Sequence, residues 1–299
     1  MERDPSKEKK AFKVKYLYQV FGLSKQGYYQ RIKRDVKRAE REYYILQAVQ
    51  EIRKILPRCG GRKLQVYLDD FFQQSGVTIG RNALFKLLRN HGMLVKKTKR
   101  FHYTTDSRHP FMKAPNLIKD SVITHSEQAI AGDITYLKTD AGYVYLSILT
   151  DLYSKKIVGW CLADHMRADL TKEALKMAHK NKVFKEVETI HHSDRGVQYC
   201  CPEYKQLAAE LGFKLSNTTR YDPYENAVAE RINETLKYEF GLKRQFVNLK
   251  ELKKAVAQAI WVYNHKRVHW SLGLRTPQEV HQSYDSLEYK SYSKTRKAG

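Results

Sequence analysis

Three apolar runs between residues 130 and 162 most constrain the fold of this chain. The segments "IAGDITYL" (Ile130–Leu137) and "YVYLSILTDL" (Tyr143–Leu152) are strand-like, and the "TDAG" between them offers a hairpin turn. The segment "KKIVGWCL" (Lys155–Leu162) predicts a third strand. Three consecutive strands joined by short connections predict an antiparallel part of a sheet.

Helical and strand-like segments alternate after these strands, which predicts an α/β domain with a mixed sheet. The expected segments are a helix at Leu170–Lys180, a strand at Val187–His191, a helix at Pro202–Leu211, a strand at Phe213–Ser216 and a final helix at Leu249–His265.

The N-terminal third is predicted to be all-α. The segment "KVKYLYQVFGLSKQGYYQRIKR" indicates two short helices that are broken at Gly22, with Ser24 as the N-cap of the second. This is a helix-turn-helix outline, which is a weak pattern because many helical hairpins share it. A longer helix over Glu42–Leu56 and helices near Arg62–Gln74 and Arg81–Asn90 follow.

The predicted helix near Arg81–Asn90 has an apolar face and a basic face. Leu84, Leu87 and Leu88 are expected to be buried. Arg81, Lys86 and Arg89 are expected to face outwards, where they would contact phosphates in a DNA groove or would simply be solvated.

The charge balance favours a polyanionic partner. The 299 residues carry 55 Lys and Arg against 32 Asp and Glu, a formal net charge of +23, which fits nucleic acid better than a need for solubility. No apolar run approaches the roughly 20 residues that span a bilayer. The four cysteines form no CxxC pair, which fits a reduced, cytoplasmic setting.

Three acids stand out by their surroundings. Asp133 lies inside an apolar strand, where an unpaired charge is costly. Asp194 follows the carboxyl end of another strand, where sheets of this class bind ligands. Glu230 lies on a predicted helix over Asp222–Gly241, with Asp222 as N-cap and Gly241 just past the end.

That helix has two faces. Val228, Ile232 and Leu236 form the predicted buried stripe, four residues apart. Asn226, Glu230, Asn233 and Lys237 share a second face, because they recur at intervals of three and four. Glu230 and Lys237 are two turns apart, about 10–11 Å along the axis. One helix can therefore offer an acid to a metal and an ammonium group to a phosphate.

Two aspartates and a glutamate suit phosphodiester chemistry with two divalent ions, because hard oxygen ligands favour magnesium or manganese. From spacing alone, a plainer interpretation stays open. Asp133 would be hydrogen-bonded in a turn, Asp194 would cap a loop and Glu230 would be a surface acid.

These blocks resemble the OrfB-type transposases of bacterial insertion sequences, the IS-three group, whose core is RNase H-like and related to retroviral integrases. "GDITYL", "HSDRGVQY" and "ENAVAERINETLK" match the three catalytic blocks, and 35 residues separate Asp194 from Glu230. "YNHKRVHWSLGLRTPQE" matches the C-terminal signature, and "GLSKQGYY" and "GGRKL" resemble the N-terminal helical region. Ile130 departs from the pattern, because an aromatic residue is expected there.

The resemblance implies a fold and an active site. The fold is an α/β RNase H-like catalytic core, with a mixed five-stranded sheet and flanking helices, preceded by all-α helix-turn-helix DNA-binding modules. Asp133, Asp194 and Glu230 would be catalytic and would bind two Mg²⁺ or Mn²⁺ ions. The DNA-contacting residues are expected to be Lys237, Arg195, Lys25, Arg31, Arg81, Lys86, Arg89 and Arg267.

The resemblance also implies a reaction and partners. The chain would bind the terminal inverted repeats as a dimer or higher oligomer, cleave one strand and transfer it by in-line transesterification through a circular intermediate. Double-stranded DNA and an upstream-frame protein are the expected partners, and the setting is bacterial cytoplasm and nucleoid. An RNase H-like nuclease and a non-catalytic DNA-binding regulator remain alternatives.

The expected domains follow from these segments. They are 1–40, a helix-turn-helix region; 41–98, a second helical DNA-binding module; 99–125, a basic linker; 126–245, the catalytic core; and 246–299, a C-terminal helix and basic tail. A zinc site made by His191, His192, Cys200 and Cys201 is a minor alternative, because two of the cysteines are adjacent.

Overall fold

The computed structural model of the protein describes residues 16, 18, 20–22, 24–96, 110–119, 121–219 and 226–283. The chain divides into two compact units. One consists of Met1–Lys54 and Gly60–Leu94, and the other of Ile55–Cys59 and Val95–Gly299. No helix within the described residues combines the length and the apolar character that crossing a membrane would require.

The first unit is helical, and its longest element corrects one expectation. Helix α2 (Lys25–Ile55) is continuous, so the separate short helix and the long helix over Glu42–Leu56 are one element. The expected domain boundary at residue 40 therefore lies inside a helix. No Pro interrupts this segment and helix-forming Lys, Arg, Glu and Ala fill it. The predicted N-cap is confirmed, because the Ser24 hydroxyl accepts a hydrogen bond from the Gly27 N–H at 3.0 Å.

The other two helices of this unit agree with the prediction. Helix α3 (Gly61–Ser75) ends at Gly76, which has a positive φ of 67°. Helix α4 (Arg81–Asn90) buries the three predicted leucines and leaves Arg81, Lys86 and Arg89 exposed. The structure shows these helices and their faces, and binding of DNA by them stays a prediction.

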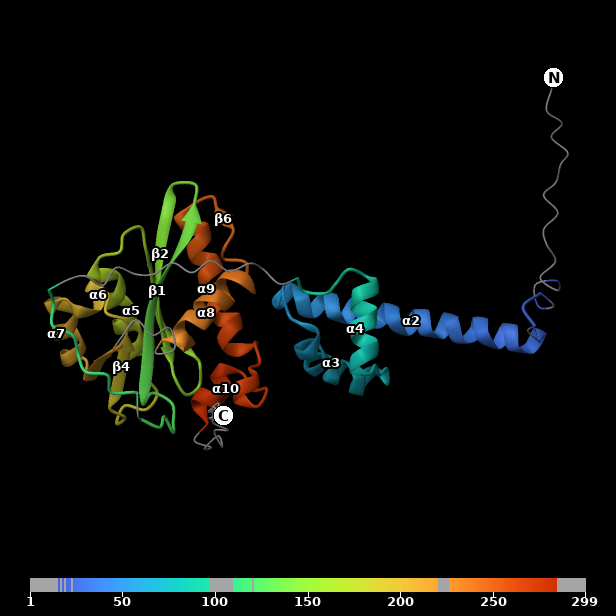
Figure 1. The fold of residues 1–299 in the computed structure, drawn as a ribbon, viewed down its shortest axis with the longest axis horizontal. Coiled ribbons are helices and arrows are strands. Elements are labelled where there is room, and N and C mark those ends of the chain that lie inside the picture. The colour runs from blue at the N-terminus through green and yellow to red at the C-terminus, as the bar shows by residue number, and fades with distance from the viewer. Residues whose placement is uncertain are drawn as a thin grey trace, which may run out of the picture. The chain divides into compact units, whose positions relative to one another are not determined.

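The second unit is built on a mixed sheet with the strand order β3-β2-β1-β4-β5 (Figure 1). Its strands are β1 (Ala129–Thr139), β2 (Gly142–Asp151), β3 (Ile157–Ala163), β4 (Thr189–Ser193) and β5 (Phe213–Asn217). Strands β1, β2 and β3 pair antiparallel, whereas β4 is parallel to both β1 and β5. The sheet also contains β6 (Gln245–Phe246), which pairs with β1 and is too short to be predicted from periodicity.

Helices cover both faces of this sheet (Figure 1). The helices are α5 (Ala168–Lys180), α6 (Val197–Cys200), α7 (Pro202–Glu210), α8 (Ala227–Tyr238) and α9 (Leu249–His265), followed by a 3₁₀ turn (Trp270–Leu272) and α10 (Pro277–Gln282). One apolar cluster joins the sheet to α5 and α7, and a second joins it to α8 and α9. Such covering on both faces is the layer architecture of an α/β domain.

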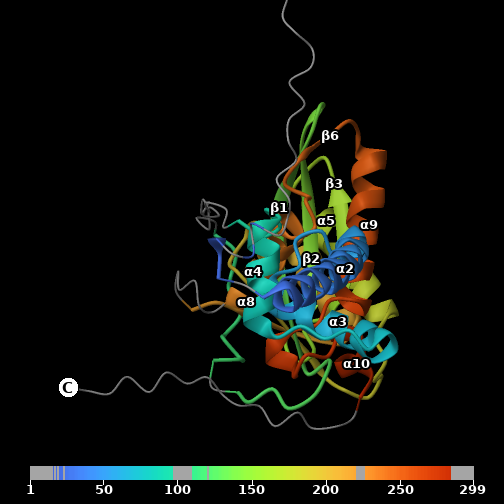
Figure 2. The same cartoon turned by 90° about the vertical axis from the view of Figure 1, so that its right-hand side faces the viewer.

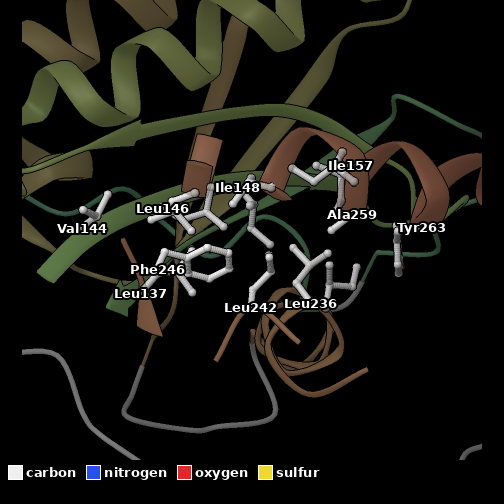
Figure 3. Close-up of a cluster of buried hydrophobic side chains, with 14 residues drawn as sticks. Leu137, Val144, Leu146, Ile148, Ile157, Leu236, Leu242, Phe246, Ala259 and Tyr263 are labelled. Carbon is white, nitrogen blue, oxygen red and sulfur yellow. The ribbon is translucent and has the colours of Figure 1, made fainter. Parts of the chain in front are cut away.

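The second cluster shows that the C-terminal helix belongs to the core (Figure 3). Leu146 and Ile148 of β2, Leu236 of α8 and Ala259 and Tyr263 of α9 lie in this one cluster. The expected boundary at residue 246 therefore does not separate two hydrophobic cores.

Helix α8 has the predicted faces, but its expected start lies outside the described residues. The proposed N-cap Asp222 belongs to residues 220–225, which the structure does not describe. Ile232 and Leu236 are buried and Val228 packs partly against them, as predicted. The helix ends earlier than predicted, because its C-cap is Glu239, and Gly241, with a φ of 74°, lies two residues beyond this cap.

Candidate active site

The two aspartates lie beside each other, Asp133 inside β1 and Asp194 directly after the end of β4. In the parallel pair of β1 and β4, Gly132 is opposite Ser193, so Asp133 and Asp194 are the next residues on adjacent strands. Neighbouring strands are about 4.8 Å apart. Residues that are 61 positions apart in the chain are therefore brought side by side.

Helix α8 lies along β1 and brings the glutamate to this place. The Asn226 side chain donates a hydrogen bond to the Gly132 carbonyl at 3.1 Å, and the Asn233 side chain donates to Asp133 Oδ2 at 2.8 Å. Glu230 lies between these two contacts on the same helical face. Both asparagines are buried, whereas Glu230 is exposed. The predicted polar face of this helix is confirmed.

The electrostatics of Asp133 reflect its two acidic neighbours. Burial, followed by the negative charges of Asp194 and Glu230, raises the pKa of Asp133 to about 7. The hydrogen bonds that Asp133 accepts from Asn233 and from the Ile134 N–H act in the opposite direction. Three carboxyl groups that repel one another in this way form a strongly electronegative site.

The chemistry of this site fits a hard divalent cation, because three carboxylates are the preferred ligands of magnesium and manganese. A cation would also offset the repulsion that raises the pKa of Asp133. As the side chains stand, no three His, Cys, Asp or Glu in the described ranges are close enough to one another to hold a metal ion. Asp194 Oδ1 instead accepts a hydrogen bond from the Gly196 N–H at 2.9 Å. Metal binding would thus require side-chain rotation.

Lys237 lies two turns beyond Glu230 on the same helical face, as predicted. Its ammonium nitrogen is 4.5 Å from the centre of the Tyr136 ring on β1, which is a cation–π contact. Burial lowers the pKa of Lys237, and the charge of Asp133 opposes this shift. The positive charge therefore lies close enough to the acids to influence them.

Arg195 supports a loop. Its guanidinium donates to the carbonyl oxygen of Thr218 at 2.6 Å and to that of Thr219. The expected contact of Arg195 with DNA stays a prediction. Gly196 is needed for close approach, because a Cβ there would lie 3.0 Å from both Asp194 Oδ1 and Gln198 Oε1.

Arg267 also differs from the expectation of a DNA contact. Its side chain is only 10% exposed, and it forms a bidentate ion pair with Glu239 at 2.7 and 2.8 Å. The pair, in which only Arg267 is buried, joins the end of α9 to the end of α8, which is a structural role. Lys25 and Arg31 on α2 are exposed, and Arg31 Nε lies 3.9 Å from Asp35.

The zinc alternative finds no support. His191 Nε2 is hydrogen-bonded to the Tyr204 hydroxyl at 2.5 Å, and His192 Nδ1 to the Ser216 hydroxyl at 2.9 Å. Burial, and to a smaller degree the neighbouring His192, lowers the pKa of His191 to about 3, so this ring is neutral. Within the described ranges no group of His and Cys side chains can hold a metal.

Gly132 is the first residue of the block "GDITYL", but the sequence analysis predicted no role for it. A Cβ at this position would lie 2.8 Å from the His191 ring and 3.0 Å from Leu149. The strand that carries Asp133 thus requires Gly next to it. Tyr136 was likewise missed, and its position three residues after Asp133 was the available signal.

Comparison with known proteins agrees with this architecture. The family described as "Integrase core domain" matches residues 124–223, and a second family of the same description matches residues 211–277. These matches cover the sheet, α8 and α9. The fold and site thus define an integrase-type polynucleotidyl transferase.

Proteins with similar sequences show to which family of this class the chain belongs. An uncharacterized 31 kDa protein of insertion element IS600 from Shigella sonnei is 31% identical over 90% of this chain and 98% of its own length. The transposase InsF for insertion sequence IS3fB from Escherichia coli K12 is 27% identical over 93% of this chain and 97% of its own length. The chain belongs to the IS3-type family of bacterial insertion-sequence transposases, which have an integrase-like core.

Two solved structures resemble this chain at a lower sequence identity than these relatives. The simian T-cell lymphotropic virus intasome in complex with a PP2A regulatory subunit is 16% identical with a TM-score of 0.47, covering 78% of this chain and 75% of that chain. The HTLV-2 integrase catalytic core domain in complex with magnesium is 17% identical with a TM-score of 0.43, covering 52% of this chain and 97% of that chain.

Proposed function

We propose that this transposase binds the terminal inverted repeats of its insertion sequence, cleaves one strand and transfers it to a second phosphodiester in line, through a circular intermediate. Asp133, Asp194 and Glu230 are the proposed catalytic and metal-binding residues. The observation that carries the proposal is the position of Glu230 between the contacts of Asn226 and Asn233 with β1, beside Asp133. We propose that these three carboxylates, distant in the chain, face one site.

The proposed cofactor is Mg²⁺ or Mn²⁺, with two ions per site. Such ions, when bound, supply Lewis-acid polarisation of the phosphodiester and activation of the attacking oxygen. Asn233 holds the Asp133 carboxylate in place through its 2.8 Å hydrogen bond. Lys237 provides an ammonium group at the other end of the same helical face and is proposed to bind a phosphate of the DNA strand.

The proposed partners are double-stranded DNA and further copies of the chain, in a dimer or higher oligomer, together with an upstream-frame protein. The exposed basic residues of α2 and α4, Lys25, Arg31, Arg81, Lys86 and Arg89, are proposed to contact phosphates of the terminal repeats. The proposed setting is the bacterial cytoplasm, in association with the nucleoid. No observation favours the alternatives of a hybrid-cleaving nuclease or a non-catalytic regulator.

A strand-transfer assay tests this proposal. The full chain is incubated with Mg²⁺ and DNA carrying the inverted repeats that flank its gene, and an RNA–DNA hybrid serves as the competing substrate. Asp133→Asn, Asp194→Asn and Glu230→Gln are each expected to abolish cleavage and joining while DNA binding survives. Glu234→Gln, an acid on the same helix, is the matched control and should retain activity. Preferential cleavage of the hybrid, or activity in any of the three variants, contradicts the proposal.

A further inference from the structure

The end of the β1–β2 hairpin carries a set of aromatic side chains that the acids do not use. In the antiparallel register Tyr136 is opposite Tyr145 and Lys138 is opposite Tyr143, so these four side chains lie on one side of the sheet. We call this set the tyrosine face. Tyr136 is 43% exposed and Tyr143 is 59% exposed. Figure 1 shows the hairpin end extending beyond α5 and α7, which cover the lower part of the sheet.

The opposite side of the same hairpin is buried, so the strands that carry the tyrosine face are packed against the hydrophobic core. Leu137, Val144 and Leu146 point into the cluster that contains Phe246 and Leu242 (Figure 3). The hydroxyl of Thr139 further closes the turn by donating to the Gly142 carbonyl at 3.0 Å. The exposed rings are therefore held in place by the strand pairing beneath them rather than by a loose loop.

The rings are arranged as an open aromatic surface. The Tyr136 and Tyr143 rings meet edge to face, with centroids 5.4 Å apart and an interplanar angle of 83°. Large exposed aromatic groups that gather in this way forgo burial, and such patches commonly mark an interaction site.

Two cations accompany the rings. The Lys237 ammonium nitrogen lies 4.5 Å from the Tyr136 ring centre, and Lys138 is exposed on the same side of the hairpin. Rings flanked by ammonium groups fit a partner that combines flat apolar groups with negative charge. The bases and phosphates of a nucleic acid strand have this combination.

The Asp133 side chain lies on the same side of the sheet as Leu137, which is opposite to the tyrosine face. Lys237, which shares a helical face with Glu230, contacts the Tyr136 ring and so joins the tyrosine face to the acids around the edge of β1. Tyr136 is three residues beyond Asp133 on the same strand, which is about 10 Å, or the rise of roughly three base pairs. On the edge away from β2, β1 is paired with β4 only as far as Gly132 and with β6 only from Lys138. Within the described residues, the edge from Asp133 to Leu137 therefore has no neighbouring strand, and α8 reaches it through Asn233 and Lys237.

We infer that the tyrosine face binds an unpaired base of the reacting DNA strand, a few nucleotides from the phosphodiester at Asp133. The base stacks on Tyr143 and Tyr136, and Lys237 and Lys138 bind the adjacent phosphates. This inference rests on the proposed function, because it assumes that DNA reacts at the three acids. The role of the tyrosines is to position the strand, and no bond is formed or broken by them.

A binding experiment with the full chain tests the inference. The parent is the Asp194→Asn variant without added metal, so that no reaction occurs. The probes are a DNA duplex with a short unpaired 3′ end that carries fluorescent aminopurine and the same duplex with abasic sites in place of the unpaired bases. Dissociation constants come from fluorescence anisotropy, and stacking is read from quenching of the aminopurine.

The parent is expected to bind the base-bearing end about tenfold more tightly than the abasic end, which is typical for one stacked base. Tyr143→Ala should abolish this difference and the quenching, whereas Tyr143→Phe, which keeps the ring, should retain both. Trp270→Ala is the control, because Trp270 is 56% exposed and lies outside the hairpin.

Equal affinity of the parent for both ends overturns the inference, as does a Tyr143→Ala variant that still distinguishes them. If Tyr143→Ala weakens both probes equally and lowers self-association, the face binds another copy of the chain instead. The assay needs no catalysis, so loss of the proposed transposase activity and loss of base stacking are separate results. A chain that transfers strands but shows no stacking contradicts this inference alone.

Discussion

At the scale of single residues, the acids depend on the amides that hold them. The Asn233 side chain fixes one oxygen of Asp133, and the Ile134 N–H fixes the other at 2.9 Å. Groups that orient a metal ligand in this way commonly change metal affinity by about 10–100-fold when they are removed. Asn233 is therefore a positioning residue for the proposed site.

The first prediction concerns this amide. Asn233→Ala is expected to raise the Mg²⁺ concentration needed for half-maximal strand transfer by about 10–100-fold, with most of the maximal rate recovered at high Mg²⁺. Titration of the rate against Mg²⁺ measures the shift. Asn181→Ala, which removes a side-chain hydrogen bond to the Val158 carbonyl, is the control and should leave the Mg²⁺ requirement unchanged. An unchanged requirement in Asn233→Ala would remove this role from Asn233.

At the scale of elements, one buried side chain of α9 forms two hydrogen bonds to the sheet, in addition to the apolar packing of this helix. Asn264 Oδ1 accepts from the Ile157 N–H at 3.0 Å, and its Nδ2 donates to the Ile157 carbonyl at 2.9 Å. The amide thus satisfies two backbone groups at the edge strand β3. A buried backbone group that loses its partner costs about 1–3 kcal/mol.

The second prediction follows from this attachment. Asn264→Leu is expected to lower the free energy of unfolding by about 2–6 kcal/mol, because both Ile157 groups lose their partner. Urea unfolding followed by circular dichroism measures it. Asn248→Ala removes only the N-cap of the same helix and should cost about 1 kcal/mol. An equal loss of unfolding free energy in Asn264→Leu and Asn248→Ala would contradict a stabilising role of the two Asn264 hydrogen bonds.

The elements also explain how much the sequence could predict. The strands that carry Asp133 and Asp194, and the helix face that carries Glu230, have periodic patterns and were predicted. The pairing of Asn226 and Asn233 with β1 depends on how α8 packs, which periodicity does not contain. Arg267 was misjudged because its partner Glu239 is 28 residues away, and the continuity of α2 was missed because a polar stretch has no apolar period.

At the scale of the whole molecule, the net charge of +23 predicts strongly salt-dependent binding of DNA. The third prediction is that Arg81→Gln, Lys86→Gln and Arg89→Gln together make the slope of log affinity against log salt less steep by up to about 0.9 for each lost phosphate contact. Anisotropy titrations over a range of salt measure the slope. Lys54→Gln is the control, because Lys54 is already paired with Glu51 at 2.6 Å. An unchanged slope in the triple variant would remove α4 from the interface.

A buried hydrogen bond connects α10 to the segment before β1. Glu127 is 3% exposed and His281 of α10 is fully buried, and His281 Nε2 lies 3.1 Å from Glu127 Oε1. Burial tends to raise the pKa of Glu127, but the hydrogen bond with His281 and those from the Val183 and Phe184 N–H groups lower it below its usual value of 4.5.

The fourth prediction is a pH dependence of stability. Because the pKa of Glu127 is lower in the folded state, its contribution is fully present above about pH 4.5 and is lost as the pH falls through the folded value. Glu127→Gln should therefore be less stable than the unmodified chain at neutral pH, and the difference should shrink below pH 4.5. Urea unfolding at several pH values measures this, and a difference that grows on acidification would contradict it.

The most direct test of the central claim is the binding of Mn²⁺ to the full chain, measured by electron paramagnetic resonance. If Asp133, Asp194 and Glu230 form one metal site, Asp133→Asn, Asp194→Asn and Glu230→Gln should each weaken Mn²⁺ binding at least about tenfold, while Glu234→Gln leaves it unchanged. Mn²⁺ binding that survives all three substitutions, or that is lost with Glu234→Gln and not with Glu230→Gln, would contradict the account.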